Sequence, residues 1–171
     1  MNELAVGEFR EYVAARQAVL YRSAVLLTGN RQDAEDLLQT ALARLAARWQ
    51  TIQRTGSPDA YVRKAMYHQR ISWWRLRRNR REHAFAEVPE VPGDGDLAAD
   101  TALRLTLAAV LRQLTPKQRA VVILRYYDDL PEGEVAGILG CSVGTVRSQT
   151  HRTLARLREL CPELASTKEL I

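Results

Sequence analysis

Hydrophobic residues recur along most of this chain with the three- and four-residue spacing of amphipathic helices. No segment of strand length alternates between apolar and polar residues, so the pattern predicts an all-α fold. Gly29 and Asn30 close a first helix that covers roughly residues 8–27. Asn30 can cap a second helix, which runs to about Gln50. The expected buried stripe of this second helix consists of Leu38, Leu42, Leu45 and Trp49.

Polar residues and a proline follow the second helix. The segment TIQRTGS, residues 51–57, is predicted to be a loop. Ser57 followed by Pro58 is typical of a helix start, because proline suits the first helical position, and a third helix is expected to run to about Arg80. Residues 82–100 combine prolines, glycines and acids without apolar periodicity, which predicts a flexible acidic linker.

The pattern after the linker is that of a helix-turn-helix. The motif TPKQ at 115–118 is a capping box with proline at the first helical position, and it opens a helix to about residue 127. A short helix is expected over 131–139, Gly140 then turns the chain, and Ser142 caps a last long helix. A short helix, a glycine turn and a longer helix form the motif whose second helix enters the DNA major groove.

Two small helical domains are therefore expected, joined by the flexible acidic linker, with the helix-turn-helix in the second. Charge separates the same segments: residues 61–81 hold eight Lys or Arg and no acid, whereas residues 82–100 hold six acids and no Lys or Arg. The net charge of +5 is thus concentrated in particular helices. The predicted division is domain 1–81, linker 82–100, domain 101–161 and tail 162–171.

Several classes of protein do not fit the sequence. The amino terminus lacks the basic and apolar regions of a secretory signal, and no apolar run has the eighteen residues of a membrane span, so a cytoplasmic protein without membrane contact is expected. Cys141 and Cys161 form no CxxC pair, which argues against a zinc site or a disulfide framework. No P-loop, HExxH or nucleophile motif is present. We therefore expect neither an enzyme nor a cofactor.

The last long helix has one cationic side. A helical wheel places His151, Arg152 and Arg156 outward together with Ser148, and Arg147 at the border. The core side is expected to hold Val143, Val146, Thr150, Leu154 and Leu157. A surface that meets phosphates and base edges must be cationic, and residues 140–158 contain no acid. The alternative is a solvated helix face, but such a face normally mixes charges, because opposite pairs four residues apart stabilise a helix by about 0.2–0.5 kcal/mol each.

The third helix carries two apolar stripes. One consists of Val62, Met66, Gln69, Trp73 and Leu76, and the other of Tyr67, Ile71 and Trp74 among the cations Arg63, Lys64, Arg70 and Arg78. The second stripe either packs against the first helix or stacks unpaired bases. Separating ten base pairs requires on the order of 14 kcal/mol, whereas one stacked base returns about 1–3 kcal/mol. A chain that handles single strands in this way would need a larger assembly to melt DNA.

Three segments together resemble a known family. They are DAEDLLQTALARLAARW at 33–49, AYVRKAMYHQRISWWRLRRNRRE at 60–82, and LTPKQRAVVILRYYDDLPEGEVAGILGCSVGTVRSQTHRTLARLR at 114–158. In this order and spacing they resemble bacterial sigma factors of the extracytoplasmic-function (ECF) class, and SWWRLRR resembles the SigE-like branch. The resemblance implies a transcription initiation factor that directs core RNA polymerase to promoters.

The resemblance also assigns roles in the first domain. The second helix would dock on the clamp helices of the polymerase beta-prime subunit, with the beta subunit as a further contact, through Asp33, Asp36, Gln39 and Arg44. The segment 50–57, with Arg54 and Thr55, would capture a flipped base of the minus-ten element. The melted strand would then lie on Lys64, Tyr67, Arg70, Trp74 and Arg78.

The second domain would read the minus-thirty-five element in double-stranded form. The matching positions are Thr145, Arg147, Ser148, His151 and Arg152. The implied partners are core RNA polymerase, promoter DNA and an anti-sigma factor, and the acidic linker would cross the polymerase cleft. Two other hypotheses are a stand-alone helix-turn-helix regulator, in which only the second domain touches DNA, and a nuclease, for which the sequence offers no catalytic motif.

Overall fold

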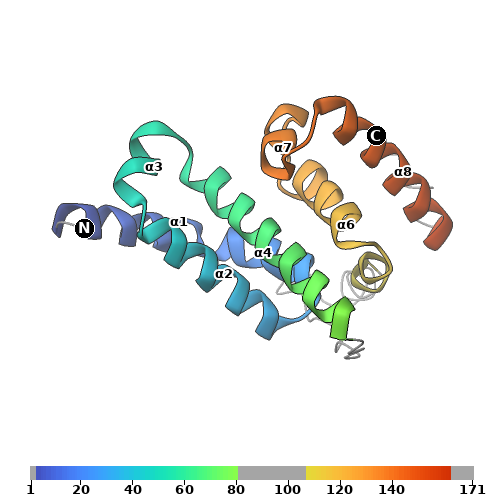
Figure 1. Cartoon of the computed structure of the whole chain (residues 1–171), viewed down its shortest axis with the longest axis horizontal. Coiled ribbons are helices and arrows are strands. Elements are labelled where there is room, and N and C mark those ends of the chain that lie inside the picture. Colours follow the sequence, from blue (N-terminus) through green and yellow to red (C-terminus); the bar gives the residue numbers. More distant parts are fainter. Residues whose placement is uncertain (1–2, 81–106, 163–171) are drawn as a thin grey trace, which may run out of the picture. The chain divides into compact units, whose positions relative to one another are not determined.

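Every regular element in residues 3–80 and 107–162, the ranges that the computed structural model describes, is helical. The all-α prediction is confirmed. The chain forms two compact units, the first containing α1 to α4 and the second α6 to α8 (Figure 1). None of the described helices is long and apolar enough to cross a membrane.

The first unit is built from three longer helices and one short one. They are α1 (Glu3–Thr28), α2 (Arg31–Ala46), α3 (Trp49–Thr55) and α4 (Pro58–Arg80). Helix α2 packs against both α1 and α4, and the three long helices lie side by side (Figure 1). The core between them includes four fully buried large side chains, Leu20, Leu37, Leu45 and Met66. Burial of each contributes about 1.5–3 kcal/mol, so this helix packing provides most of the unit's stability.

The predicted starts of α2 and α4 are confirmed. Gly29 has φ 84°, in the left-handed region that favours glycine, and ends α1. The Asn30 side chain accepts a hydrogen bond of 2.7 Å from the backbone N–H of Asp33 and caps α2. The Ser57 hydroxyl accepts one of 3.3 Å from the N–H of Ala60, at the start of α4. Helix α1 begins about a turn earlier than predicted, at Glu3.

The predicted loop at 51–57 is wrong, because most of it belongs to α3. Helix α2 ends at Ala46, so Trp49 lies in α3 and not at the end of α2. The Trp49 ring is buried, and its centroid lies 5.4 Å from those of both Phe9 and Tyr12 of α1. The buried Trp49 fixes one end of this short polar segment against α1 and so stabilises it as a helix. The composition of the segment alone does not reveal this contact.

Helix α4 extends past its partner, which explains a second difference from the prediction. Arg70 donates from Nε to the carbonyl oxygen of Leu27 at 3.2 Å, and α1 ends one residue after Leu27. The side chain of Leu76, predicted to be buried, lies beyond this level and is 57% exposed. A helical wheel gives the direction of a side chain but not the length of the helix that covers it.

The second unit holds the expected helix-turn-helix. Residues 107–112 are helical, followed by α6 (Pro116–Val122), a π-helical turn η1 (Ile123–Tyr127), α7 (Glu132–Leu139) and α8 (Val143–Leu160). The capping box of Thr115 and Gln118 is present in both directions, as predicted. The buried Arg119 donates from Nε to the carbonyl oxygen of Leu111 at 2.8 Å and ties the preceding helical turn to α6.

The turn between α7 and α8 also agrees with the prediction. Gly140 has φ 66° and ψ 41° and ends α7, and the Ser142 hydroxyl accepts a 3.1 Å hydrogen bond from the Thr145 N–H to cap α8. Val146 is fully buried as expected. Thr153 is fully buried too, a position that the wheel did not assign, whereas the other expected core positions of α8 are half-buried: Val143, Thr150, Leu154 and Leu157.

Candidate nucleic-acid interface

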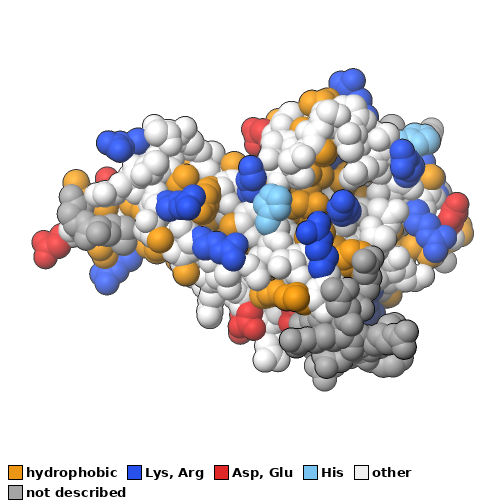
Figure 2. Space-filling view, viewed as in Figure 1, with side chains coloured by type: hydrophobic (Ala, Val, Ile, Leu, Met, Phe, Trp, Pro, Cys, Tyr) orange, Lys and Arg blue, Asp and Glu red, His pale blue; other side chains and the backbone are white. Residues whose placement is uncertain are grey.

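The exposed side of α8 carries the predicted DNA-contacting residues. Arg147, His151 and Arg152 are exposed, and Thr145 and Ser148 are half-buried beside them. The Ser148 hydroxyl donates to the carbonyl oxygen of Thr145 at 3.0 Å, so these two polar residues are held together at the start of the helix. Figure 2 shows Lys and Arg side chains in blue over α8. This arrangement can meet phosphates and base edges with one helix face.

Arg147 has an acidic partner that the sequence did not indicate. Its Nε donates to Oε2 of Glu132, in the first turn of α7, at 2.7 Å. The Arg147 side chain is 68% exposed, so an isolated pair of this kind adds little to stability. Its effect is on geometry, because a bond at Nε limits the directions in which the terminal guanidinium nitrogens can point. Glu132 therefore joins the candidate interface.

Much of the predicted single-strand surface of α4 is not exposed. Tyr67 and Ile71 are buried, and Arg70 is tied to the end of α1 through Leu27. Trp74 is half-buried, and Arg78 lies in the last turns of α4, whose side chains are outside the described part of the chain. Base stacking on Tyr67 would therefore require its buried ring to become exposed.

A different face of α4 is cationic and exposed. Lys64 lies there as predicted, and His68 and Arg75 share its side of the helix. His68 lies four residues after Lys64, and Arg75 lies seven residues after His68. This helical spacing could have revealed the cationic stripe of Lys64, His68 and Arg75 from the sequence alone. Burial, and then the charge of Lys64, lower the pKa of His68 below its ordinary value. Lys64 and Arg75 therefore supply the positive charge of this stripe at neutral pH.

Arg54 and Thr55 are exposed at the end of α3. Both side chains bond to the preceding turn of the same helix, Arg54 Nε to the carbonyl oxygen of Gln50 at 3.1 Å and Thr55 Oγ1 to that of Thr51 at 2.7 Å. Gly56 and Ser57 alone separate this helix from α4. The predicted base-capturing segment is therefore a helix end followed by a two-residue turn.

The four predicted polymerase-binding residues of α2 do not share one face. Asp36 and Gln39 are exposed on the same side, to which Gln32 and Ala43 also belong. Asp33 takes part in the cap, where its carboxylate accepts a 3.0 Å hydrogen bond from Asn30 Nδ2. Arg44 donates from Nη2 to Oε1 of Gln69 in α4 at 2.6 Å. The side of α2 opposite its core is thus centred on Asp36 and Gln39.

Comparisons with known proteins match both units. The family described as Sigma-70 region 2 matches residues 10–82, and Sigma-70, region 4 matches residues 104–157. The RNA polymerase sigma-E factor of Streptomyces coelicolor is 49% identical over 154 residues, which cover 90% of this chain and 86% of that protein. The ECF RNA polymerase sigma factor SigL of Mycobacterium tuberculosis is 32% identical over 157 residues, covering 88% and 87%.

The chain belongs to the ECF sigma factors. As a sigma factor it binds core RNA polymerase, recognises promoters and directs the initiation of transcription, and it is not itself an enzyme. In the regulator hypothesis the first domain would sense a ligand or dimerise, but that domain matches Sigma-70 region 2. The nuclease hypothesis is likewise set aside.

A solved structure also shares the fold of this sigma factor. The sigma factor RpoE of Bartonella quintana, crystallised in complex with the anti-sigma factor NepR, aligns with a TM-score of 0.72 at 23% identity. The alignment covers 91% of this chain and 97% of that one. At this identity the likeness concerns the arrangement of helices, and the residue roles have to be argued from this chain's own side chains.

Proposed function

We propose that this sigma factor divides promoter recognition between its two units. The domain of residues 101–161 reads the minus-thirty-five element as duplex through Thr145, Arg147, Ser148, His151 and Arg152 of α8. The domain of residues 1–81 binds the polymerase and holds the melted minus-ten element. The acidic segment 82–100 joins the two domains, and residues 162–171 form a short tail.

The observation that carries this proposal is the separation of charge and exposure among the helices. The exposed side of α8 is cationic up to Arg158, and its first acid is Glu159. The exposed stripe of α4 in the other unit is also cationic, whereas α2 exposes the acids Glu35 and Asp36. Nucleic acid is attracted to the first two surfaces and repelled by the third, which leaves α2 for the polymerase beta-prime clamp helices.

In the first unit the proposal assigns core binding mainly to Asp36 and Gln39, with Asp33 and Arg44 at the border. Minus-ten capture belongs to Arg54 and Thr55. The melted strand passes along Lys64 and continues to Arg70, Trp74 and Arg78, with Tyr67 reached only if its buried ring becomes exposed. His68 and Arg75 extend this path along the exposed stripe of α4.

The decisive experiment reconstitutes the full chain with core RNA polymerase and sequences the transcripts made on genomic DNA. A shared pair of elements about ten and thirty-five bases upstream of the start sites is expected. Lys64→Ala should then weaken strand opening at all these promoters, whereas Arg152→Ala should weaken selection of the upstream element. Transcripts that start at unrelated sequences, or no change with either variant, would contradict the division of labour.

A protein partner and a location follow from the same role. We place the sigma factor in the cytoplasm, because polymerase and chromosomal DNA are there. We also expect an anti-sigma factor that covers the exposed side of α2 and the cationic side of α8, since an inhibitor of both contacts would block initiation. Competition between such a protein and core polymerase for this chain, measured by fluorescence anisotropy, tests that expectation, and simultaneous binding of both would contradict it.

A further inference from the structure

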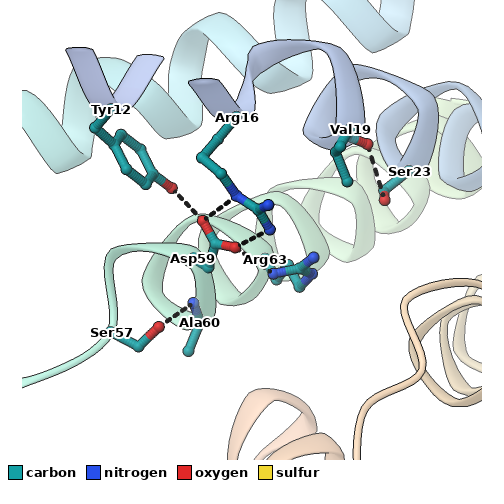
Figure 3. Close-up of polar contacts among 8 residues, drawn as sticks. All are labelled: Tyr12, Arg16, Val19, Ser23, Ser57, Asp59, Ala60 and Arg63. Carbon is teal, nitrogen blue, oxygen red and sulfur yellow. Dashed lines mark hydrogen bonds and ion pairs between the residues drawn. The ribbon is translucent and has the colours of Figure 1, made fainter. Parts of the chain in front are cut away.

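One side chain of α1 contacts both helices that flank the proposed base-capturing turn. Tyr12 donates a 2.8 Å hydrogen bond from its hydroxyl to Oδ1 of Asp59, the second residue of α4 (Figure 3). Its ring also packs on Trp49, the first residue of α3, with a centroid distance of 5.4 Å and an interplanar angle of 45°. The hydroxyl thus holds the start of α4 while the ring holds the start of α3.

Asp59 is the centre of a polar cluster that joins α1 to α4. Arg16 donates to both of its carboxylate oxygens, from Nε at 3.2 Å and from Nη2, and the buried Arg63 donates to Oδ2 at 3.3 Å (Figure 3). Two guanidinium groups and one phenol thereby surround a single carboxylate. An aspartate in this position has little freedom to move, because each oxygen accepts at least two hydrogen bonds.

The protonation states of Asp59 and Tyr12 preserve this arrangement near neutral pH. Burial alone would raise the pKa of Asp59, but the hydrogen bonds from Arg16 and Tyr12 and the nearby guanidinium charges lower it below the ordinary value. Burial, and then the hydrogen bond to Asp59, raise the pKa of Tyr12 above its ordinary value. Asp59 is therefore ionised and Tyr12 remains a donor at neutral pH, so the hydrogen bond between them is retained there.

The turn itself has few restraints of its own. Gly56 is extended, with φ −161° and ψ −165°, and its N–H donates to the Ile52 carbonyl oxygen at 2.9 Å. The Ser57 hydroxyl bonds within the first turn of α4, and Arg54 and Thr55 bond within α3. These contacts are all local. The position of Arg54 and Thr55 in space consequently depends on how the short helix α3 and the start of α4 are held.

We propose that Tyr12 is a positioning residue for minus-ten recognition, which sets the distance and angle between α3 and α4 through Trp49 and Asp59. This inference rests on the proposed role of the segment 50–57, which includes Arg54 and Thr55, in base capture. Tyr12 touches no DNA. Its hydroxyl acts by keeping the turn in the geometry into which an extruded base fits, and a base-binding pocket tolerates only small displacements.

The test uses Tyr12→Phe in the full chain, reconstituted with core polymerase. Phenylalanine keeps the ring on Trp49 and removes only the bond to Asp59. Open-complex formation is measured on a matched promoter and on promoters with one base changed in either element. The preference for the correct minus-ten base should fall by up to about tenfold, because a turn that is held less firmly fits the extruded base less well, and the loss of one hydrogen bond limits the size of the effect. The preference at the minus-thirty-five element and the affinity for core polymerase should not change.

Tyr21→Phe is the matched control, because it removes a hydroxyl from the same helix without affecting Asp59. Circular dichroism at the assay temperature establishes that both variants are folded. If Tyr12→Phe lowers activity equally on every promoter, or leaves the minus-ten preference intact, the positioning role is wrong. A variant that merely loses stability would reduce the active fraction and would not change a ratio between promoters.

Parallel assays of Arg54→Ala and Thr55→Ala separate this inference from the proposed function. If these variants lower minus-ten preference and Tyr12→Phe does not, base capture stands and the positioning role fails. If none of the three changes the preference, both fail. If Tyr12→Phe alone lowers it, the positioning role stands and the captured base is contacted by other residues of the turn.

Discussion

At the scale of single residues, the candidate interface depends on where guanidinium groups point. Arg147 and Arg152 are exposed on α8, whereas Arg63 and Arg70 of α4 bond to Asp59 and to the end of α1. The sequence alone does not distinguish these two pairs of arginines, because their charge is the same. Arginines of the first kind can form bidentate contacts with guanine, and those of the second kind stabilise the fold.

Arg152→Ala should weaken binding of the matched minus-thirty-five duplex by about 1–3 kcal/mol, because a bidentate contact with a base edge would be lost. Fluorescence anisotropy on matched and single-base-substituted duplexes measures the change. Equal weakening on all sequences would identify a phosphate contact instead.

Glu132→Gln should strengthen DNA binding, in contrast to Arg152→Ala. A neutral amide in place of the carboxylate holds Arg147 Nε more weakly and removes a charge that repels phosphates, so affinity for unrelated duplex should rise. The preference for the matched sequence should fall at the same time. Titrations over a range of salt concentrations measure both effects. Glu159→Gln, which breaks the exposed pair with Arg156, is the control, and an equal effect of the two variants would exclude a special role for Glu132.

Asp59 gives the first unit a pH dependence whose sign follows from its lowered pKa. A carboxylate with a lower pKa in the folded state stabilises the protein above its ordinary pKa, and this contribution disappears as the pH falls through the folded value. Asp59→Asn should therefore reduce the free energy of unfolding by about 1–3 kcal/mol at pH 7. The difference from the wild type should shrink below about pH 4.

Urea denaturation at a series of pH values measures this difference. Asp36→Asn removes the same charge from the exposed side of α2 and is the control, expected to have little effect at any pH. If the difference in the free energy of unfolding between the wild type and Asp59→Asn stayed constant down to about pH 2, the ionised form of Asp59 would make no specific contribution to stability.

At the scale of elements, the turn of the helix-turn-helix depends on one backbone conformation. Gly140 has φ 66°, and a Cβ built there meets no atom within 4 Å. Gly140→Ala should therefore destabilise the second unit by about 1–2 kcal/mol through backbone strain alone. Thermal unfolding followed by circular dichroism measures the effect.

Gly137→Ala provides a matched comparison three residues earlier. This glycine lies within α7, and a Cβ there also has open space. Alanine should stabilise the helix by about 0.5–1 kcal/mol, because glycine is the poorer helix former. The two substitutions add the same methyl group and should shift the melting temperature in opposite directions. A shift of equal sign would show that the turn is not limited by the conformation of Gly140.

Element boundaries were predictable where a capping residue marks them. Asn30, Thr115 and Ser142 each accept a hydrogen bond from the third residue beyond, as their side-chain chemistry indicated. Helix α3 was missed because no cap precedes it: Arg48 makes no capping hydrogen bond with its side chain. That helix depends instead on the packing of Trp49 against α1, to which a local pattern is blind.

At the scale of the whole molecule, two units that contact separate promoter elements should contribute independently. Lys64→Ala in the first unit and Arg152→Ala in the second should weaken promoter binding by the holoenzyme additively, within about 0.5 kcal/mol. Each unit is compact by itself, which is the reason to expect no coupling. A double-mutant cycle on one promoter measures the interaction energy, and a value above about 1 kcal/mol would mean that the units communicate.

By itself the sequence determined the helices other than α3, the caps at Asn30, Thr115 and Ser142, the helix-turn-helix and the cationic side of α8. These features arise from hydrogen bonds and side-chain spacings within about four residues, so a linear pattern contains them. Only the tertiary structure decided which side of α4 is covered, that Tyr12 reaches Asp59 across 47 residues, and that Glu132 holds Arg147 across 15. Those contacts depend on how helices are placed against one another, and that placement is set by packing of whole faces rather than by any local pattern.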